Sequence, residues 1–485
     1  MRIPVYVIAF TLLVLLGLGA VPVHFDEAQY TTWLANPELS YQTKGPLVTF
    51  MQSLTHVEWL PQIVQVRVSA WMAWLVSGVL LVWLGALAGF DRDASRRLVI
   101  LYALSPMLLA LGSVQTTDIW LLASLLLALG AFASILHCRP NMHTELWWML
   151  MGAALGIGAL AKLSIALLPM ALAPWVLLRK PQLLFSAGPY LGALLCALCM
   201  TPWILWNDAN DYAHLAHELG HVDSDDDSMI YAIRWIPEML LAVIPVVWVA
   251  VFGGISFRQE SFLSDAQQTV REMLKWAAIA IITLFCIKGL FGKVLLNWTL
   301  PLVPFVLLAL AAGLKWSPRT VLTAGVGQVA IYLMLLFPYG VGLSVEQDAF
   351  QKIRGWDGAV QRAADLAGPT DVLTSDHYGT LAWGLFFWPS EAPGVDRYTS
   401  PVGQVIPEAT RRKNQYDHWA VLDTPHPRIV HLGSPNPGLI RRCGTFNTLG
   451  AVPQVMPDGT IRSELLVSEC LDFKPDPAWP EITAH

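Results

Sequence analysis

Two adjacent acids near the start of the chain, Asp26 and Glu27, are the strongest candidates for acid–base chemistry. They directly follow the apolar run 3–23, so their carboxylates should emerge within about one helical turn of a membrane surface. There a carboxylate can reach a lipid headgroup without being buried in hydrocarbon, and it could accept the proton of an attacking hydroxyl group. The structural alternative is that both acids are solvated residues that follow a helix.

A set of cations accompanies these acids. Lys44 precedes a Gly-Pro turn, Arg67 begins an apolar run, and three further lysines stand in tight turns or at the ends of such runs: Lys162, Lys288 and Lys293. Several cations beside one or two carboxylates suit a phosphorylated lipid, because the cations neutralise the phosphate. Each lysine by itself could equally extend toward the lipid headgroups, so only the set indicates a phosphate site.

Asp118, which opens the apolar run 118–136, is a further candidate acid. An acid in the first turn of a helix interacts favourably with the helix dipole, and this alone would explain its position. In the functional interpretation Asp118 lies near Asp26 and orients an acceptor or a sugar hydroxyl group.

A polar segment after a later apolar run holds Trp206 and Asn207, followed by His214, His217 and His221. Histidines spaced by three and four residues share one face of a helix, which is one arrangement that binds zinc. We favour a surface helix, or polar contacts to a sugar, and we expect no required metal or other cofactor.

The composition is that of a polytopic membrane protein. Of the 485 residues, 55% are hydrophobic and 14% are charged, and the formal net charge is −6. The chain has no basic tract, so nucleic-acid binding has nothing to start from. Residues 1–23 could alternatively be a cleaved signal peptide, but ten more apolar runs follow, and we interpret the run as a retained first helix.

About eleven transmembrane helices are predicted, and because several runs are shorter than about 20 residues the number could differ by one or two. The runs are 3–23, 67–89, 97–114, 118–136, 146–161, 163–178, 183–204, 231–253, 273–290, 294–313 and 319–340.

The distribution of positive charge predicts the orientation of these helices. One set of alternate connections holds twelve cations: Arg2, Arg92, Arg96, Arg97, Arg139, Arg179, Lys180, Arg258, Arg271, Lys275, Lys315 and Arg319. The other set, away from helix ends, holds only the four lysines named above. The first set should be cytoplasmic, which places the external loops 24–66 and 205–230, with Asp26, Lys44 and Asp118, on the opposite side.

The composition changes near residue 341, and two domains are predicted: a membrane domain, 1–340, and a small soluble α/β domain, 341–485, on the extracytoplasmic side. The pattern of the second domain indicates helices at 346–367 and 378–388 and strands at 371–375 and 428–432. It contains two cysteines, Cys443 and Cys470, which could form a disulfide in an oxidising compartment or remain two thiols in a β-rich core.

The order of several short motifs resembles the integral-membrane glycosyltransferases of the C-type (GT-C) fold. The motifs are FDEAQY, YQTKGPL, SPMLLALGSVQTTD, LGIGALAKLS, TPWILWNDANDYAHLAHELGH and GKVLLNW, followed in the tail by IRGWDGAV, LTSDHYGTLAW and NQYDHWAVLD. The chain is most similar to the bacterial relatives of dolichyl-phosphate-mannose protein mannosyltransferases and to the aminoarabinose transferases that modify lipid A. Each motif alone is weak, but their order and their placement on one membrane face are specific.

The resemblance implies inverting transfer of a sugar from a polyprenyl-phosphate carrier to an acceptor outside the cytoplasm. Asp26 matches the catalytic acid of the first external loop and Glu27 its neighbour, while Lys44 matches the lysine that contacts the lipid phosphate. Asp118 matches the acid of a Thr-Pro-Asp pattern, and Lys162 the lysine after a Gly-rich helix.

Two departures from the family pattern stand out. Thr117 occupies a position where proline is common, and Leu295-Leu296 stand before Asn297-Trp298 where the family usually has Glu-Pro. An acidic role at the second point is therefore lost. The residues expected to contact substrate are Tyr30, Trp206, Asn207, His217, His221 and Asn297.

The predicted function is therefore a glycosyltransferase of a bacterial inner membrane, with its active site on the periplasmic side. Its partners would be membrane lipids, the lipid-linked donor, and a glycolipid, glycan or protein acceptor. In the predicted mechanism Lys44 and Lys162 hold the donor phosphate, assisted by Lys288, Lys293 or Arg67. One alternative is a flippase for a lipid-linked sugar, although the ionisable residues gather at one membrane face and not at the midplane. Another is an assembly subunit that retains the fold without activity.

Overall fold

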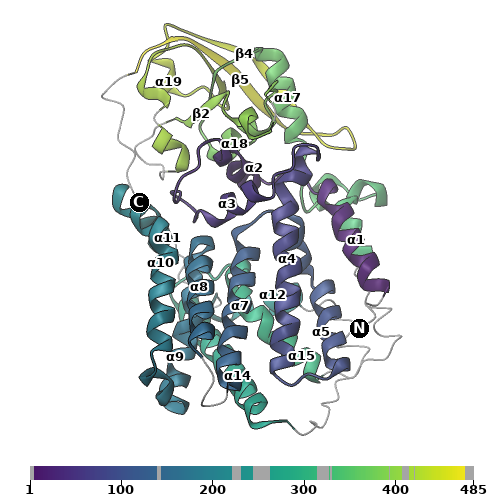
Figure 1. Ribbon diagram of the computed structural model, residues 1–485. Coiled ribbons are helices and arrows are strands. Elements are labelled where there is room, and N and C mark those ends of the chain that lie inside the picture. Colours follow the sequence, from purple (N-terminus) through teal and green to yellow (C-terminus); the bar gives the residue numbers. More distant parts are fainter. Residues whose placement is uncertain are drawn as a thin grey trace.

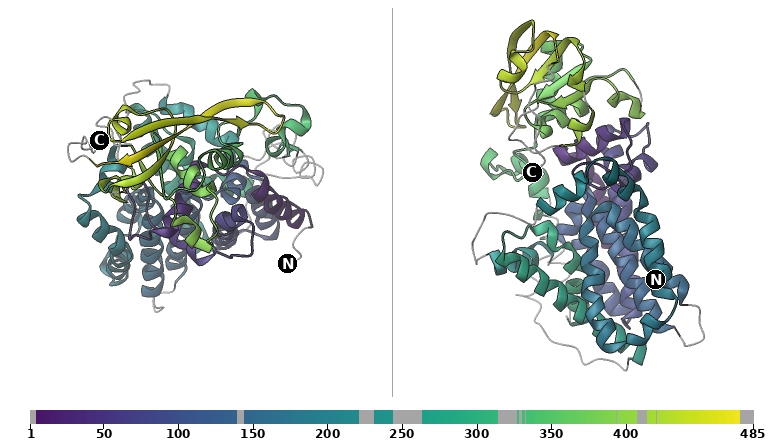
Figure 2. Two further views of the ribbon diagram at one scale, coloured as in Figure 1. Left: turned by 90° about the horizontal axis from the view of Figure 1, so that it is seen from above. Right: turned by 90° about the vertical axis from the view of Figure 1, so that its left-hand side faces the viewer.

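The computed structural model describes residues 5–138, 144–220, 231–243, 263–313, 327, 330–331, 333–392, 394–406, 414–419 and 421–475. A bundle of long helices forms one end of the molecule and an α/β unit forms the other (Figure 1). Short helices from the N-terminal quarter of the chain lie between the two parts, as the side view in Figure 2 also shows.

The bundle is built from apolar helices that coincide with most of the predicted runs. They are α1 (Val5–Ala20), α4 (Gln62–Leu87), α5 (Arg92–Leu104), α6 (Pro106–Ser113), α7 (Thr117–His137), α8 (Glu145–Ala161), α9 (Leu167–Arg179), α10 (Gly188–Ala209), α12 (Tyr231–Val243), α14 (Asp265–Leu290) and α15 (Val303–Gly313). The short 3-10 helices η2 (Leu163–Ala166) and η4 (Leu296–Leu302) lead into α9 and α15. Apolar helices in this number make the chain a multi-pass membrane protein.

Five of these units are long and apolar enough to cross a membrane: α4, α7, α10, α14 and the η4–α15 unit. The bent pair α5–α6 would make a sixth, and α8 and α9 are shorter apolar helices. The predicted count of eleven is not confirmed, because parts of the runs 231–253 and 319–340 lie outside the described residues.

The predicted span 97–114 is not one straight helix. It breaks between α5 and α6, whose axes differ by 59°. Proline disfavours the helical conformation of the residue before it and lacks an amide hydrogen, and Ser105, which precedes Pro106, is extended with ψ 120°. The break turns the chain toward the membrane face that also holds the start of α7.

α7 is the central helix of the bundle. In its apolar window 83% of the residues are buried, against 11% in α10, so α7 is enclosed by protein while α10 presents its side chains outward. A helix with an apolar outward face suits the hydrocarbon of a bilayer, and an enclosed helix suits the positioning of a polar residue at its end. Asp118 is such a residue.

Two short helices, α2 (Phe25–Thr32) and α3 (Leu47–Leu54), lie in the connection between α1 and α4, the loop that was predicted from the sequence to be the first external loop. α2 begins with a capping box, in which the His24 side chain accepts a hydrogen bond from the Asp26 amide and the Glu27 carboxylate accepts one from the His24 amide. The box fixes the first turn of α2, and with it the directions of both acids.

The C-terminal unit contains α17 (Trp356–Ala367), β1 (Val372–Ser375), α18 (Tyr378–Phe387), β2 (Val402–Val405), β3 (His426–Leu432), α19 (Pro437–Ile440), β4 (Thr445–Val455) and β5 (Ile461–Phe473). The sheet order is β2-β1-β3-β5-β4. β1 is parallel to β2 and β3, whereas β5 is antiparallel to β3 and β4. The predicted α/β character is confirmed, while the domain boundary at 340/341 stays a prediction.

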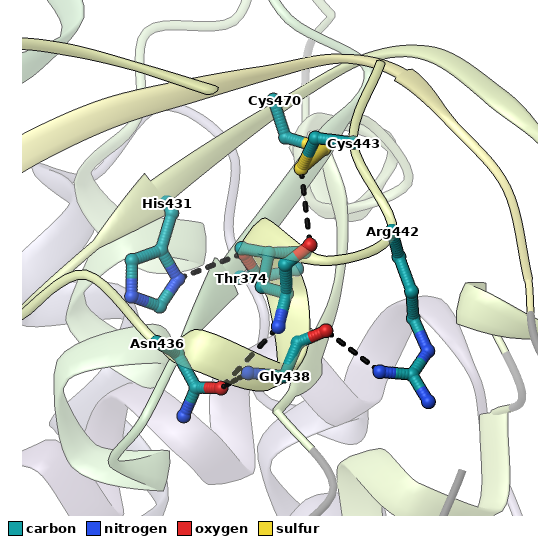
Figure 3. Close-up of a disulfide and its surroundings, with 8 residues drawn as sticks. Thr374, His431, Asn436, Gly438, Arg442, Cys443 and Cys470 are labelled. Atoms are coloured by element: carbon teal, nitrogen blue, oxygen red, sulfur yellow. Dashed lines mark hydrogen bonds between the residues drawn. A yellow bond between two sulfur atoms is a disulfide. The ribbon is translucent and has the colours of Figure 1, made fainter. Parts of the chain in front are cut away.

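A disulfide joins Cys443 to Cys470, with their Cα atoms 5.3 Å apart. Figure 3 shows it beside α19, where Asn436 caps the helix by accepting hydrogen bonds from the amides of Gly438 and Leu439. The bond ties the segment before β4, the edge strand, to its neighbour β5. The pairing that the sequence left open is therefore present in the structure.

Candidate functional site

The first group of the site is a polar triad at the end of the central helix. Asp118 lies in the first turn of α7 and is 7% exposed. The Lys162 ammonium donates to its Oδ1 at 2.8 Å, and the Asn297 amide donates to its Oδ2 at 3.4 Å. Three segments far apart in the sequence thus converge on one carboxylate, and all three residues were predicted site residues.

Lys162 reaches Asp118 because α8 ends one residue earlier. Lys162 is the C-cap of α8, with extended backbone (φ −161°, ψ 129°). The same helix end also receives the first external loop: a Cβ added to Gly45 would collide with the backbone carbonyl of Leu160. Only glycine permits this approach, so the Lys44-Gly45-Pro46 turn is seated against the chain two residues before Lys162.

Lys44 and Lys162 both act on Glu218, an acid that the sequence analysis missed. Burial would raise the pKa of Glu218, but the His214 contact and then the charges of the two lysines outweigh it and lower the pKa to about 2. Nε2 of His214 lies 3.7 Å from the Glu218 carboxylate. In the described part of the chain no side-chain hydrogen bond or ion pair holds the Lys44 ammonium, so Lys44 is available to a ligand.

The second group of the site surrounds Asp26, whose side chain is about one-third exposed. Tyr30 follows it by one turn of α2 and is almost fully buried (3% exposed). Burial raises the pKa of the Tyr30 hydroxyl well above its ordinary value, and the charges of Asp26 and Asp118 raise it further. The Tyr30 hydroxyl therefore lies within electrostatic range of both acids.

Glu27 and Arg67 have a structural role in place of the predicted roles in catalysis and phosphate binding. The two side chains are completely buried and form a bidentate pair, with Nε donating to Oε1 at 2.8 Å and Nη2 to Oε2 at 2.7 Å. The guanidinium also donates to the carbonyls of Val21 and Pro22, and the Gln115 amide donates to Glu27 at 2.8 Å. A carboxylate and a cation that neutralise each other in this way hold α2, α4 and the α6–α7 junction together, and neither is open to substrate.

Lys288 and Lys293 lie in another environment. The Lys288 ammonium is 5.9 Å from the centre of the Trp298 ring, and Lys293 lines a small hollow with Arg234 and Glu238. Of this segment, Asn297 makes the contact with Asp118. A role of either lysine toward a donor phosphate stays a prediction.

Of the three predicted histidines, His214 is buried and is bound within the protein. Nδ1 of His214 accepts a hydrogen bond from the Trp203 indole at 2.9 Å, and α11 (Ala213–Gly220) carries both His214 and His217. His221 lies outside the described residues. Within the described ranges no group of three metal-binding side chains comes together.

Asn207 also has a structural role. It is fully buried, its amide donates to the Trp203 carbonyl, and its side-chain oxygen accepts from the Leu215 amide at 3.2 Å. These bonds connect the end of α10 to α11, which positions Glu218. Asn207 therefore positions α11 and does not present its amide to substrate.

Trp206 takes part in a junction that the sequence analysis did not anticipate. Its indole donates to Glu38 at 2.6 Å, and Glu38 accepts two more hydrogen bonds, from Trp419 at 2.9 Å and from Gln415 at 3.1 Å. The three donors come from α10 and from the C-terminal unit, while Glu38 belongs to the first external loop. A lone acid in a polar loop gives no signal from which these partners could have been found.

The sequence profile of the dolichyl-phosphate-mannose-protein mannosyltransferases matches residues 43–206, which hold Lys44, Asp118 and Lys162. Among curated protein sequences none matches the chain. The class of protein is therefore defined by fold: the chain is similar throughout to a solved GT-C membrane protein.

That protein is ArnT from Cupriavidus metallidurans. Its structure in the apo state matches with a TM-score of 0.63 and 14% identity over 96% of this chain and 97% of ArnT. Its structure bound to undecaprenyl phosphate matches with a TM-score of 0.61 and 13% identity over 99% of each chain. The predicted resemblance to the GT-C glycosyltransferases is thus confirmed in the fold, over both the helical and the α/β part.

Proposed function

We propose that the protein is an inverting glycosyltransferase that moves a sugar from a polyprenyl-phosphate carrier to a hydroxyl-bearing acceptor outside the cytoplasm. The observation that carries the proposal is the convergence of the Lys162–Asp118 pair and the Lys44-Gly45-Pro46 turn at one end of the central helix, together with Tyr30, on which the charges of both Asp118 and Asp26 act. The similarity of the fold to ArnT, which was solved with undecaprenyl phosphate, supports this class of donor.

The donor phosphate binds at the two lysines in this proposal. Lys44 precedes the Gly-Pro turn that is seated against the end of α8, and no side chain among the described residues forms a hydrogen bond or ion pair with its ammonium group. Lys162 is already oriented by Asp118 at 2.8 Å. A phosphate that reaches them replaces the water around Lys44 and joins the Lys162–Asp118 pair. Asp118 then keeps Lys162 directed at the leaving oxygen. The Asn297 amide fixes the position of Asp118, and the charge of Glu218 attracts the two lysines.

The transfer step requires a base on the acceptor side. Asp26 is about one-third exposed, so it can meet a hydroxyl group that arrives from outside. It accepts the proton of that hydroxyl as the oxygen bonds to the anomeric carbon and the bond from that carbon to the phosphate oxygen breaks. The electron pair leaves with the polyprenyl phosphate, whose charge the lysines stabilise. Alignment and charge stabilisation are the main contributions, because a phosphate is a good leaving group.

Buried Tyr30 completes this arrangement. Among the described residues its hydroxyl has no hydrogen-bond partner, although it lies beside both acids. Its raised pKa keeps it protonated, so it can donate to an oxygen of the sugar between Asp26 and Asp118. The sequence analysis predicted Tyr30 as a substrate contact, and we retain it in that role.

The test compares Asp26→Asn and Lys44→Ala with matched controls. In reconstituted full-length protein, Lys44→Ala should weaken binding of undecaprenyl phosphate about tenfold or more, whereas Lys474→Ala, at an exposed position directly after β5, should leave it unchanged. Asp26→Asn should bind the lipid normally and abolish covalent transfer of labelled sugar in membranes of a deletion strain, and Asp371→Asn should transfer normally. Near-normal transfer by Asp26→Asn, or movement of labelled lipid across the membrane without covalent transfer, would overturn the proposal.

We further propose that the site faces the periplasm of a bacterial inner membrane. The asymmetry of lysine and arginine supports this side, and so does the disulfide between Cys443 and Cys470, because disulfides persist in oxidising compartments. Lipid A, a cell-wall glycan and a protein are the acceptor classes to be tested, and mass analysis of the glycolipids and glycans of the deletion strain distinguishes them.

A further inference from the structure

The N-terminal end of α18 is fixed next to Asp26 although it belongs to the C-terminal unit. The Phe25 ring packs edge-on against Tyr378 and against Trp383, with ring centres 5.5 Å and 5.6 Å apart. The Trp383 indole donates to the carbonyl of Val23 at 2.9 Å. Phe25 and Val23, which make these contacts, lie within three residues of Asp26, so the position of Tyr378 relative to Asp26 is set by direct packing.

The place of Tyr378 in the sheet is one that serves ligand binding in α/β proteins. β1 lies between β2 and β3, both parallel to it, and α18 follows β1 directly. In open sheets of this type ligands bind outside the carboxyl ends of the strands, where neighbouring connections leave in opposite directions. Here α18 begins at Tyr378, and its first residues pack on Phe25 of α2. The carboxyl end of β1 is therefore directed at α2.

The turn before Tyr378 is rigid. The His377 amide donates to the Ser375 hydroxyl at 3.3 Å, and the His377 ring accepts from the Gly379 amide at 3.1 Å, which caps α18. A Cβ added to Gly379 would lie 3.1 Å from the Phe25 ring, so the turn is packed closely on α2. Tyr378 is therefore presented to Asp26 by a preformed backbone.

Of the hydroxyls of Tyr416 and Tyr378, that of Tyr378 is available to a ligand. Tyr416, also close to Asp26, shares its hydroxyl with Thr32 at 3.2 Å. Tyr378 is only half-buried, and in the part of the chain that the structure describes its hydroxyl makes no hydrogen bond. Burial and the charge of Asp26 raise the pKa of Tyr378, so the group remains a neutral donor and acceptor at physiological pH.

Tyr378 also lies on the side from which the nucleophile must come. Lys44, Lys162 and Asp118, at the start of α7 and the end of α8, form the group that we assign to the phosphate, whereas Tyr378 packs on Phe25, the neighbour of Asp26. Inversion requires the attacking oxygen and the leaving phosphate to stand on opposite faces of the anomeric carbon. The donor phosphate occupies the lysine side, which leaves the side of Asp26 and Tyr378 for the acceptor.

We propose that Tyr378 is an acceptor-binding residue: its hydroxyl hydrogen-bonds the acceptor next to Asp26, so that the C-terminal unit forms one wall of the acceptor site. The inference rests on the proposed glycosyl transfer and adds the ligand group that Tyr378 recognises, a sugar or side-chain hydroxyl. In this proposal the C-terminal unit supplies a substrate-binding residue, so the reaction site is incomplete without it.

The experiment uses Tyr378→Phe in the full chain, which removes one oxygen and keeps the ring packing against Phe25. Transfer of labelled sugar is measured in detergent-solubilised membranes of the deletion strain, diluted stepwise so that the acceptor becomes limiting. Loss of one hydrogen bond to substrate should lower transfer about threefold to tenfold when acceptor is limiting, and less when it is abundant. Binding of undecaprenyl phosphate should be unchanged.

Tyr190→Phe is the matched control, and it should transfer like the unchanged protein. Tyr190 is exposed in the first turn of α10, which packs beside the start of α8, whereas Lys162 caps the other end of α8. Formation of the Cys443–Cys470 disulfide, read by thiol labelling, reports whether the C-terminal unit of each variant is folded. Equal transfer by Tyr378→Phe and the unchanged protein at every dilution would overturn the inference, even if Asp26→Asn is inactive as proposed. If Asp26→Asn remains active, the proposed function fails instead.

Discussion

The carboxylate of Glu27 and the guanidinium of Arg67 face each other through two parallel hydrogen bonds, 2.8 Å and 2.7 Å long, in a completely buried position. Asp26, its neighbour in α2, is about one-third exposed. Successive residues of a helix point about 100° apart, so one acid of the pair enters the protein while the other faces outward. The two acids should therefore respond differently to the same substitution.

Glu27→Gln should cause a folding defect. Removing the charge leaves a buried guanidinium without its partner, which costs about 3 to 5 kcal/mol. The expected result is a large loss of detergent-resistant folded protein in gel filtration and a lower melting temperature, whereas Asp26→Asn should leave both unchanged. A folded but inactive Glu27→Gln variant would return Glu27 to the catalytic role.

Substitution of Lys162 should affect both the donor site and Asp118. Lys162→Met keeps much of the aliphatic volume but leaves the 7% exposed Asp118 without its cation. We expect undecaprenyl phosphate binding to weaken about tenfold or more, measured by native mass spectrometry. The double variant Lys162→Met/Asp118→Asn, which removes both charges, should recover folded protein without recovering lipid binding. If the single variant binds the lipid normally, Lys162 is a partner of Asp118 only.

The helical positions and the polar groups at their ends could be predicted from the sequence, because apolar runs and cations at run ends are local signals. Lys44, Lys162, Asp118 and Asn297 are near their predicted neighbours for that reason. Glu38 and Glu218 were missed because each is an isolated acid, Glu38 in a polar loop and Glu218 in the short helix α11, and their partners are supplied by the tertiary structure.

The C-terminal sheet was predicted only in part for a related physical reason. β1 and β3 are short strands with runs of consecutive buried residues, and their positions were confirmed. β4 contains Gly450 and Pro453 and pairs with β5 through two register shifts, so its side chains do not alternate regularly. A hairpin of this kind has little pattern along the sequence and is stabilised by pairing and by the disulfide.

Stability should depend on pH through Glu218. Its pKa is lowered to about 2 in the folded protein, below the ordinary value of 4.5, so the unfolded chain binds a proton more readily. The resulting stabilisation is complete above about pH 4.5 and is lost as the pH falls toward about 2. Melting temperatures between pH 6 and pH 3 should fall less steeply in Glu218→Gln than in the unchanged protein. Equal slopes would mean that the lysines and His214 do not act on Glu218 as described.

The disulfide should stabilise the C-terminal unit. Cys443 and Cys470 are 27 residues apart, and closing a loop of this length removes entropy worth about 3 to 4 kcal/mol from the unfolded chain. The Cys443→Ser/Cys470→Ser variant should show faster proteolysis within the sheet than the unchanged protein, with the bundle unaffected. Both cysteines should resist alkylation until a reductant is added, and alkylation without reductant would contradict the bond.

Glu38 should control how firmly the C-terminal unit is held over the site. It accepts hydrogen bonds from two indoles and one amide, and indole groups can only donate. In Glu38→Gln the new amide nitrogen must face at least one of these donors, so at least one charge-assisted bond, worth about 1.5 to 3 kcal/mol, is lost. Hydrogen–deuterium exchange should then rise in 415–419 and around Trp206, while exchange in β4 and β5 stays the same. Because Tyr378 belongs to the unit that is loosened, transfer at limiting acceptor should fall as well, although undecaprenyl phosphate still binds normally. Unchanged exchange in 415–419 would show that the packing of Phe25 and Trp383 is sufficient to hold the unit in place.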